Sequence, residues 1–251
     1  MQRYFVKNSQ IKNDEIEITN SDVHHITTVM RGQIGDEILL CSDCGVTYFS
    51  QIIELNKTAV RLKLIGEKEE NSEMPVHVVV AQGLAKSDKL EMVVQKITEC
   101  GAVGFIPTVM KRSVVKVDSK KIDKKLERWQ KIALEAARQS HRQVVPEIYN
   151  LATFDEVTKM AKDYDLCFFG YEAHTSEVAS GLKDVIASLK PGMKVLALIG
   201  PEGGIDPDEV IKLVAAGFIM VGLGPRIMRT ETAPVYMMAA LSYGIEIERK
   251  I

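Results

Sequence analysis

A loop at residues 222–233 carries the side chains of this chain that are best suited to chemistry. Its sequence, Gly-Leu-Gly-Pro-Arg-Ile-Met-Arg-Thr-Glu-Thr-Ala, places Arg229 two residues before Glu231. A guanidinium can stabilise a developing negative charge, and a carboxylate can accept a proton. Gly224 lets the backbone approach a ligand, and Pro225 stiffens the turn. The alternative is an ordinary connector in which Arg229 and Glu231 form a structural salt bridge.

A second glycine-rich loop follows the apolar run at residues 194–199. It reads Gly200-Pro-Glu-Gly-Gly204, and a helix start, Asp206-Pro-Asp-Glu209, comes directly after it. Asp206 can cap that helix, and Pro207 suits its first position. In open parallel sheets, ligands bind beyond the carboxyl ends of the strands. Because both loops follow apolar strands, we expect them to form the walls of one pocket.

The elements around these loops have the pattern of an α/β sheet. The runs at 76–81 and 194–199 are nearly continuous apolar strands, as in a parallel sheet covered on both faces. Residues 86–100 are expected to form a helix with apolar residues at helical spacing. The chain is expected to close with an apolar helix at 235–248, with Thr232 as the N-cap.

The first part of the chain is β-rich. Strands are expected at 38–41, 47–53 and 58–65, with a helical segment at 21–31, and a small barrel is the natural closure for such strands. The charged stretch 67–73 marks a boundary. We therefore predict two domains, 1–72 and 73–251.

The two loops together resemble the paired signature of the RsmE family. The matching segments are Leu198-Ile-Gly-Pro-Glu-Gly-Gly204 and Leu223-Gly-Pro-Arg-Ile-Met-Arg-Thr-Glu-Thr-Ala233. Two further segments match, His25-Ile-x-x-Val-Met-Arg31, with Met30 in place of the more usual leucine, and Gln139-Ser-x-Arg142. The resemblance implies an α/β fold of SPOUT type, with a parallel sheet and a C-terminal trefoil knot, preceded by a small PUA-like β-barrel domain that binds RNA. It also implies S-adenosylmethionine-dependent methylation of N3 of a uridine in 16S ribosomal RNA of the small ribosomal subunit.

The resemblance also assigns roles to residues of the two loops. Arg229 is expected to stabilise negative charge on the base, and Glu231 to accept the N3 proton or to orient Arg229. The predicted cofactor-binding residues are Ile199, Gly200, Glu202, Gly203, Leu223, Gly224, Ile227, Met228, Thr232 and Ala233. Neither loop has the GxGxxG fingerprint of a dinucleotide site, which disfavours a nicotinamide-dependent oxidoreductase. No metal is expected.

Residues 110–142 form the basic part of a chain whose formal net charge is −2. They hold eleven lysines and arginines against four acids. A one-signed excess of this kind indicates a phosphate-binding surface, although a charge run on a helix is usually only a solvated face. Contacts with RNA are predicted for Arg3, Arg31, Lys111, Arg112, Arg138 and Arg142. For Arg31, a surface ion pair is an equal alternative.

Composition restricts the cellular setting. The chain has 46% hydrophobic and 26% charged residues, and no run approaches the ~20 apolar residues of a membrane span. The N-terminal segment lacks the pattern of a signal peptide, and the four cysteines, including the CxxC pair Cys41 and Cys44, are expected to be reduced. These features predict a cytoplasmic protein without a membrane partner. The resemblance adds a homodimer with the helix at 235–248 in the interface.

Two other functions compete with this interpretation. One is a related SPOUT enzyme that methylates a ribose 2′-hydroxyl or another base. The other is a non-catalytic RNA-binding factor for ribosome assembly that keeps the barrel and the basic helix. Binding of S-adenosylmethionine separates an enzyme from such a factor.

Overall fold

The chain folds into two compact units. The computed structural model describes residues 1–19, 21–114, 119–172 and 181–249. One unit consists of Met1–Glu73 and Ala137–Val145, and the other of Met74–Ala136 and Pro146–Ile251. The segment 137–145 therefore interrupts the larger unit in sequence and folds with the smaller one.

The smaller unit is a five-stranded sheet with the strand order β1-β3-β4-β5-β2. The β1 and β3 strands pair in parallel, and the other neighbours are antiparallel. Tyr4, Leu40 and Leu62 lie in its buried core. Sequence patterns did not predict β1 and β2. The strands are β1 (Arg3–Val6), β2 (Glu15–Ile18), β3 (Glu37–Ser42), β4 (Thr47–Leu55) and β5 (Val60–Lys68).

Three short helical turns accompany this sheet. They are η1 (Asn8–Gln10), α1 (Asp22–His24) and η2 (His25–Val29), the last of which is π-helical. The helical segment predicted at 21–31 is therefore present but ends earlier. It ends because Arg31 takes a positive φ of 54°, a conformation that no helix continues.

The larger unit is built on a parallel sheet with the order β12-β10-β11-β6-β7-β8, in which β9 also pairs with β7. Every pairing in this sheet is parallel. The strands β6 and β11 are almost wholly buried, as their continuous apolar sequences predicted. The strands are β6 (His77–Gly83), β7 (Gly104–Val109), β8 (Glu147–Ile148), β9 (Ala152–Thr153), β10 (Leu166–Gly170), β11 (Lys194–Ile199) and β12 (Ile219–Val221).

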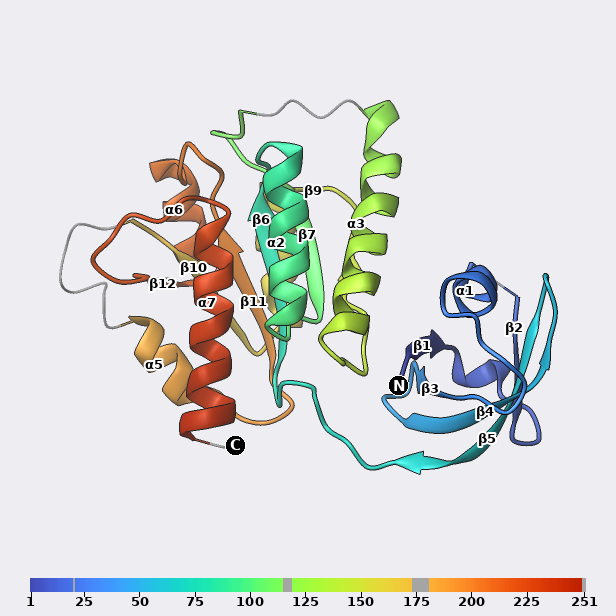
Figure 1. Ribbon diagram of the computed structural model, residues 1–251. Coiled ribbons are helices and arrows are strands. Elements are labelled where there is room, and N and C mark those ends of the chain that lie inside the picture. Colours follow the sequence, from blue (N-terminus) through green and yellow to red (C-terminus); the bar gives the residue numbers. More distant parts are fainter. Residues whose placement is uncertain (20, 115–118, 173–180, 250–251) are drawn as a thin grey trace. The chain divides into compact units, whose positions relative to one another are not determined.

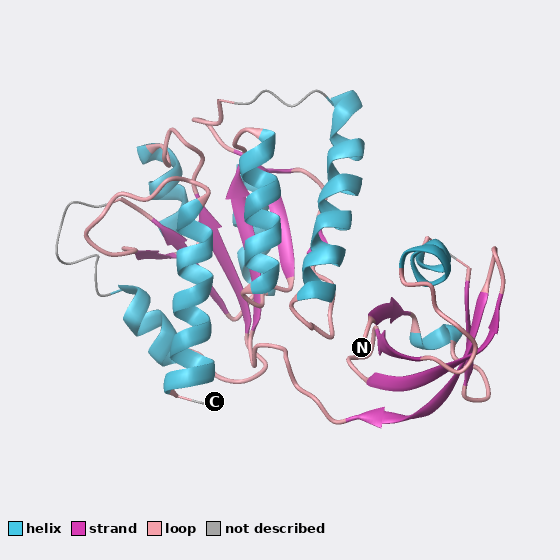
Figure 2. Cartoon of the chain, viewed as in Figure 1, coloured by secondary structure: helices cyan, strands magenta, loops and turns pink. Residues whose placement is uncertain are grey.

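Helices cover this sheet, and α2 and α7 lie side by side in front of its strands (Figures 1 and 2). No helix among the described residues is long and apolar enough to span a membrane. The helices are α2 (Ser87–Glu99), α3 (Ser119–Gln139), α4 (Phe154–Met160), η3 (Ala161–Asp163), α5 (Gly181–Ser188), α6 (Pro207–Ala215), α7 (Thr232–Ser242) and the π-helical turn η5 (Tyr243–Glu248).

Of the helix starts predicted for α6 and α7, the first is confirmed and the second is wrong. The Asp206 carboxylate accepts a hydrogen bond from the Asp208 amide, and Glu209 completes the capping box, so the predicted start of α6 is confirmed. The prediction that Thr232 caps α7 is wrong, because Thr232 is already its first helical residue. The amides of Thr232 and Ala233 both donate to the carbonyl of Arg229, which winds the chain before the expected cap.

Candidate active site

The strand register brings four carboxyl ends into one row. Ile199 of β11 pairs with Gln82 of β6 on one side and with Gly170 of β10 on the other. Gly170 in turn pairs with Val221 of β12. Both glycine-rich loops therefore start from the same edge of the sheet, where α/β folds bind ligands.

A buried hydrogen-bond cluster joins the two loops to each other and to β6. The hydroxyl of Thr230 donates to the carbonyl of Gly200 at 2.7 Å. The amide nitrogen of Gln82 donates to the Thr230 hydroxyl at 2.8 Å and to the Gly200 carbonyl at 3.2 Å. Both side chains are buried, so these bonds are shielded from competition with water. The loop after β12 is thus fixed over the ends of β11 and β6.

Glycines allow the close packing at this edge. A Cβ atom on Gly83 would lie 2.5 Å from the nitrogen and the Cδ of Pro201. A Cβ atom on Gly170 would lie 2.8 Å from Ile199 and 3.4 Å from Leu223. A side chain on Gly83 would displace the Gly200 loop, whereas one on Gly170 would require the Ile199 side chain to move.

One lysine lies between the two acidic side chains of the loops. The Lys89 ammonium of α2 lies 3.3 Å from Glu202 Oε1 and 3.2 Å from Glu231 Oε2. Burial alone would raise the pKa of Glu202, but backbone amides and Lys89 lower it below its ordinary value. Burial alone would lower the pKa of Lys89, whereas Glu231 and Glu202 raise it above its ordinary value. Glu202 and Lys89 are therefore charged at neutral pH.

The structure separates Arg229 from Glu231. The Glu231 side chain is only 13% exposed, and the cation that it faces is Lys89. Arg229 is exposed, and it has no ion-pair partner among the described residues. The internal salt bridge that would have made this loop an ordinary connector is therefore not formed.

The predicted cofactor-binding residues differ in how accessible they are. Leu223 lies against Gly170, Gly224 has a φ of 99°, and Ile227 is 69% exposed. Gly203 instead packs on Arg112, since a Cβ there would lie 3.0 Å from the Arg112 backbone oxygen. Ile199 and Ala233 are buried, Gly200 and Met228 are half-buried, and Thr232 is exposed. The Glu202 side chain is 23% exposed.

Comparisons with known proteins agree with this architecture. A family model described as RNA methyltransferase domain matches residues 72–242, and one described as RNA methyltransferase PUA domain matches residues 18–65. Ribosomal RNA small subunit methyltransferase E of Bacillus subtilis is 42% identical to this chain over 253 residues, which cover 99% of both proteins. The chain belongs to the RsmE family. The predicted SPOUT-type parallel sheet with a preceding PUA-like domain is thereby confirmed.

Solved structures show the same RsmE architecture. A crystal structure of a hypothetical protein, 42% identical in sequence, superposes with a TM-score of 0.91 and covers 99% of this chain and 100% of that one. A methyltransferase from Legionella pneumophila, solved with the bound cofactor SAM, is 27% identical with a TM-score of 0.82. The match covers 96% of each chain.

Three of the arginines predicted to contact RNA are engaged by acids of their own unit. Arg3 is 4% exposed and lies 2.6 Å from Glu70, and Arg142 is 2% exposed and pairs with Glu73. Arg138 lies 2.6 Å from Asp22 and stacks over Tyr4. Burial of Arg3 and Arg142 speaks against the phosphate contacts predicted for them. Their guanidinium groups instead attach the strand β1 and the segment 137–145 to this unit.

The remaining predicted RNA residues are accessible. Arg31 is exposed at the end of η2. The Lys111 ammonium lies 2.8 Å from Asp206 and 2.9 Å from Asp208, and Arg112 Nε lies 3.2 Å from Asp206. Lys111 and Arg112 therefore present cations at the edge of the sheet, with acids of α6 holding them in place.

Sequence reasoning missed three residues of this RsmE site, Gln82, Lys89 and Thr230. Gln82 is a polar residue at the end of the apolar strand β6, which is the only sequence signal for it. Thr230 lies inside the recognised loop but was assigned no role. Lys89 carries no local signal, because both of its partners are more than a hundred residues away in the sequence.

Proposed function

We propose that this RsmE-family chain transfers a methyl group from S-adenosylmethionine to N3 of a uridine in 16S ribosomal RNA of the small ribosomal subunit. The 42% identity over the whole chain to a ribosomal RNA small subunit methyltransferase supports the reaction class. The observation that carries the proposal is the joining of both signature loops by Thr230 and Gln82, with the unpaired Arg229 beside them.

The residues at this edge fit the proposed cofactor. Leu223, Ile227 and Met228 offer apolar surface for an adenine ring, and an isoleucine that is 69% exposed is suited to being covered by a ligand. Gly200 and Gly224 leave the backbone free of side chains, so that its polar groups can approach the ligand. When bound, the cofactor supplies an electrophilic methyl carbon on a sulfonium.

In the proposed reaction, Glu231 accepts the N3 proton and Arg229 stabilises the resulting anion. The N3–H bond of the uridine breaks, and its proton passes to the Glu231 carboxylate directly or through water. The N3 electron pair forms the new bond to the methyl carbon, and the carbon–sulfur bond breaks. Arg229 stabilises the negative charge that develops on the base oxygens. Glu231 could alternatively orient Arg229, although its observed neighbour is Lys89.

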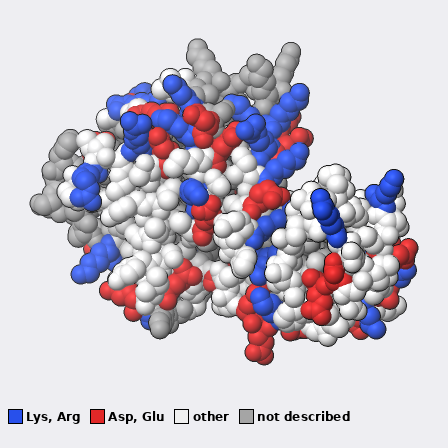
Figure 3. Space-filling model, viewed as in Figure 1, with Lys and Arg blue, Asp and Glu red and all other residues white. Residues whose placement is uncertain are grey.

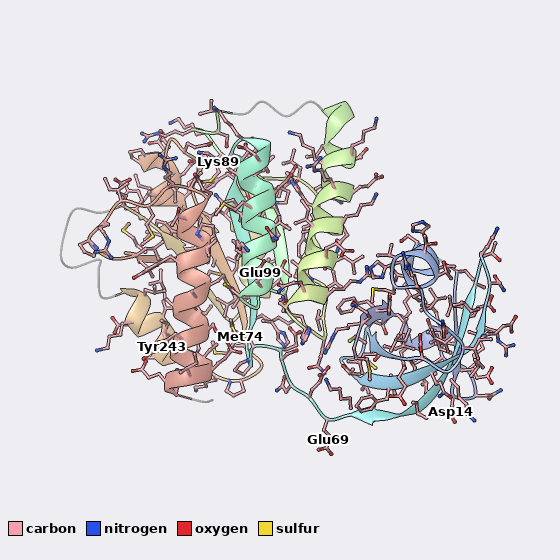
Figure 4. The ribbon with its side chains drawn as sticks, in the orientation of Figure 1. Asp14, Glu69, Met74, Lys89, Glu99 and Tyr243 are labelled. Atoms are coloured by element: carbon pink, nitrogen blue, oxygen red, sulfur yellow. The ribbon has the colours of Figure 1, made fainter. Side chains whose placement is uncertain are left out.

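Base pairing would block N3, so the uridine must be presented unpaired or extruded from its stack. We propose that Arg31, Lys111 and Arg112 contact the surrounding phosphates, because all three are accessible. Figure 3 shows lysines and arginines gathered with acids at the upper end of the larger unit. Lys89 marks the same end in Figure 4.

We also propose a homodimer through α7 and η5. Tyr236, Tyr243 and Ile247 are 41%, 58% and 62% exposed, although the helix is also apolar on its buried side. The surface over the middle of α7 is largely free of charged groups in Figure 3. A monomer in sedimentation at micromolar concentration would contradict this dimer.

The trefoil knot and the cytoplasmic location also belong to the proposal. The chain runs from the edge strand β12 across the ends of β10 and β11 to Gln82, and this crossing supports the proposed knot. Small ribosomal subunits, the proposed substrate, place the reaction in the cytoplasm.

Methyl transfer to small ribosomal subunits that lack the modification tests the function. Mass mapping of the modified nucleoside should find the new methyl group on N3 of a uridine. A methyl group on a ribose 2′-oxygen or on another base would contradict the N3 assignment. Failure to bind S-adenosylhomocysteine in calorimetry would favour a non-catalytic assembly factor.

A further inference from the structure

Lys89 occupies a helix position that is unfavourable for a cation. It is the third residue of α2, which begins at Ser87. The N-terminal end of a helix carries a partial positive charge, which favours acids and disfavours lysine. Figure 4 shows Lys89 at this end of α2, with Glu99 at the other. The helix itself gives no reason for a lysine here, so the reason lies in its neighbours.

Those neighbours are the acids of the two signature loops. Glu202 follows β11, and Glu231 directly precedes α7, yet both carboxylates contact the single ammonium of Lys89. The amide of Lys86 adds a second contact to Glu202, at 3.4 Å. The start of α2 thus holds the Glu202 loop and lies against the last residue of the other loop.

Partial burial makes this arrangement sensitive to the loss of the cation. The side chains of Lys89, Glu202 and Glu231 are 25%, 23% and 13% exposed. Charges that are largely removed from water interact more strongly than surface charges. Without the ammonium, two carboxylates that contact the same point would repel each other and would be partly desolvated.

Glu231 directs one carboxylate oxygen at the lysine. Its Oε2 is buried, and the Lys89 ammonium lies 3.2 Å from it. The lysine is therefore the group that fixes the position of this carboxylate at the start of α2.

We propose that Lys89 is a positioning residue of the methyl transfer. Its ammonium holds the loops of Glu202 and Glu231 together at the cofactor site and orients the Glu231 carboxylate for proton transfer. The second part of this inference rests on the function proposed above, whereas the linkage of the loops does not.

The test compares Lys89→Met, which removes the charge, with Lys89→Arg, which keeps it. Lys96→Met is the matched control, because Lys96 lies on the same helix and pairs with Glu99 at 2.8 Å. Amide hydrogen exchange in the cofactor-free protein reports on residues 200–204 and 222–231. Calorimetry with S-adenosylhomocysteine reports on the site.

In Lys89→Met, both loops should exchange faster, and S-adenosylhomocysteine should bind about ten-fold more weakly. Lys89→Arg should restore both properties, and Lys96→Met should leave them unchanged.

Unchanged exchange in either loop of Lys89→Met would overturn the inference. So would a Lys89→Arg variant that is impaired as strongly as Lys89→Met. If the unmodified protein does not bind S-adenosylhomocysteine, the proposed function fails, and the exchange measurement still decides whether Lys89 links the loops.

Discussion

The hydroxyl of Thr230 donates a 2.7 Å hydrogen bond to the carbonyl of Gly200. This bond spans 30 residues of sequence and joins the two loops that carry most of the predicted cofactor-binding residues. The same hydroxyl accepts from Gln82 of the central strand β6. The wall of the site is therefore attached to the core of the sheet through one buried threonine.

Replacing Thr230 with valine should loosen this wall. The variant keeps the volume but leaves the Gln82 amide and the Gly200 carbonyl with fewer partners, and a buried unsatisfied group costs about 1–3 kcal/mol. The free energy of unfolding should fall by that amount in urea titration, and binding of S-adenosylhomocysteine should weaken in calorimetry. Thr230→Ser should retain both properties. Thr158→Val is the control, because the Thr158 hydroxyl bonds only an exposed carbonyl of its own helix.

Gly83→Ala should displace the Gly200 loop. The added Cβ would lie 2.5 Å from backbone and ring atoms of Pro201, which cannot swing away as a flexible side chain does. Overpacking of this kind typically costs about 1–3 kcal/mol, so the melting temperature should fall and cofactor binding should weaken. Gly66→Ala is the matched control, because no atom lies within 4 Å of its added Cβ. Equal melting temperatures for the two variants would contradict the prediction.

The sequence predicted those features of the site that depend on local patterns. Apolar runs followed by glycine-rich loops indicated strands of a parallel sheet, whose carboxyl ends necessarily share an edge. The spacing from Asp206 to Glu209 indicated a capping box for the same local reason. The cap predicted at Thr232 was wrong, because the carbonyl of Arg229 already starts the winding of α7.

Local sequence patterns did not predict contacts between segments that lie far apart in the sequence. Gln82 donates a hydrogen bond to Thr230, which lies 148 residues away in the sequence, and no local spacing predicts that contact. Arg3 and Arg142 were predicted to lie at the RNA because the segments that carry them resemble RNA-binding segments of the RsmE family. They are buried because Glu70 and Glu73, each more than 60 residues away, supply carboxylates for them. Residues 137–145 fold with the smaller unit although the larger unit surrounds them in sequence, and no sequence pattern predicts this either.

Acid should weaken the smaller unit through Glu70. Burial alone would raise the pKa of Glu70, but hydrogen bonds from Arg3 and Lys68 lower it to about 2. A pKa depressed from its ordinary value stabilises the folded state fully above about pH 4.5, and this contribution is lost as the pH falls toward 2. At neutral pH the contribution is about 3 kcal/mol. Urea titrations at pH 7 and pH 3 should show this loss.

Glu70→Gln should lower the stability at pH 7 and flatten its dependence on pH. Glu69→Gln is the control, because Glu69 is exposed and points away from the chain in Figure 4. If Glu70→Gln lost as much stability between pH 7 and pH 3 as the unmodified protein, another carboxylate would be responsible for the acid sensitivity.

Arg229→Ala should separate catalysis from folding. Arg229 is exposed and has no ion-pair partner among the described residues, so its removal should leave the melting temperature and the affinity for S-adenosylhomocysteine unchanged. Loss of one group that stabilises a developing anion typically lowers kcat by about 10²–10³-fold, which single-turnover methyl transfer to small subunits would measure. Arg61→Ala is the control, because Arg61 forms exposed ion pairs in the smaller unit, and it should retain turnover. Near-normal turnover in Arg229→Ala would remove Arg229 from the mechanism. The stabilisation of the uridine anion would then fall to backbone amides of the loop or to a second cation supplied by the bound RNA complex.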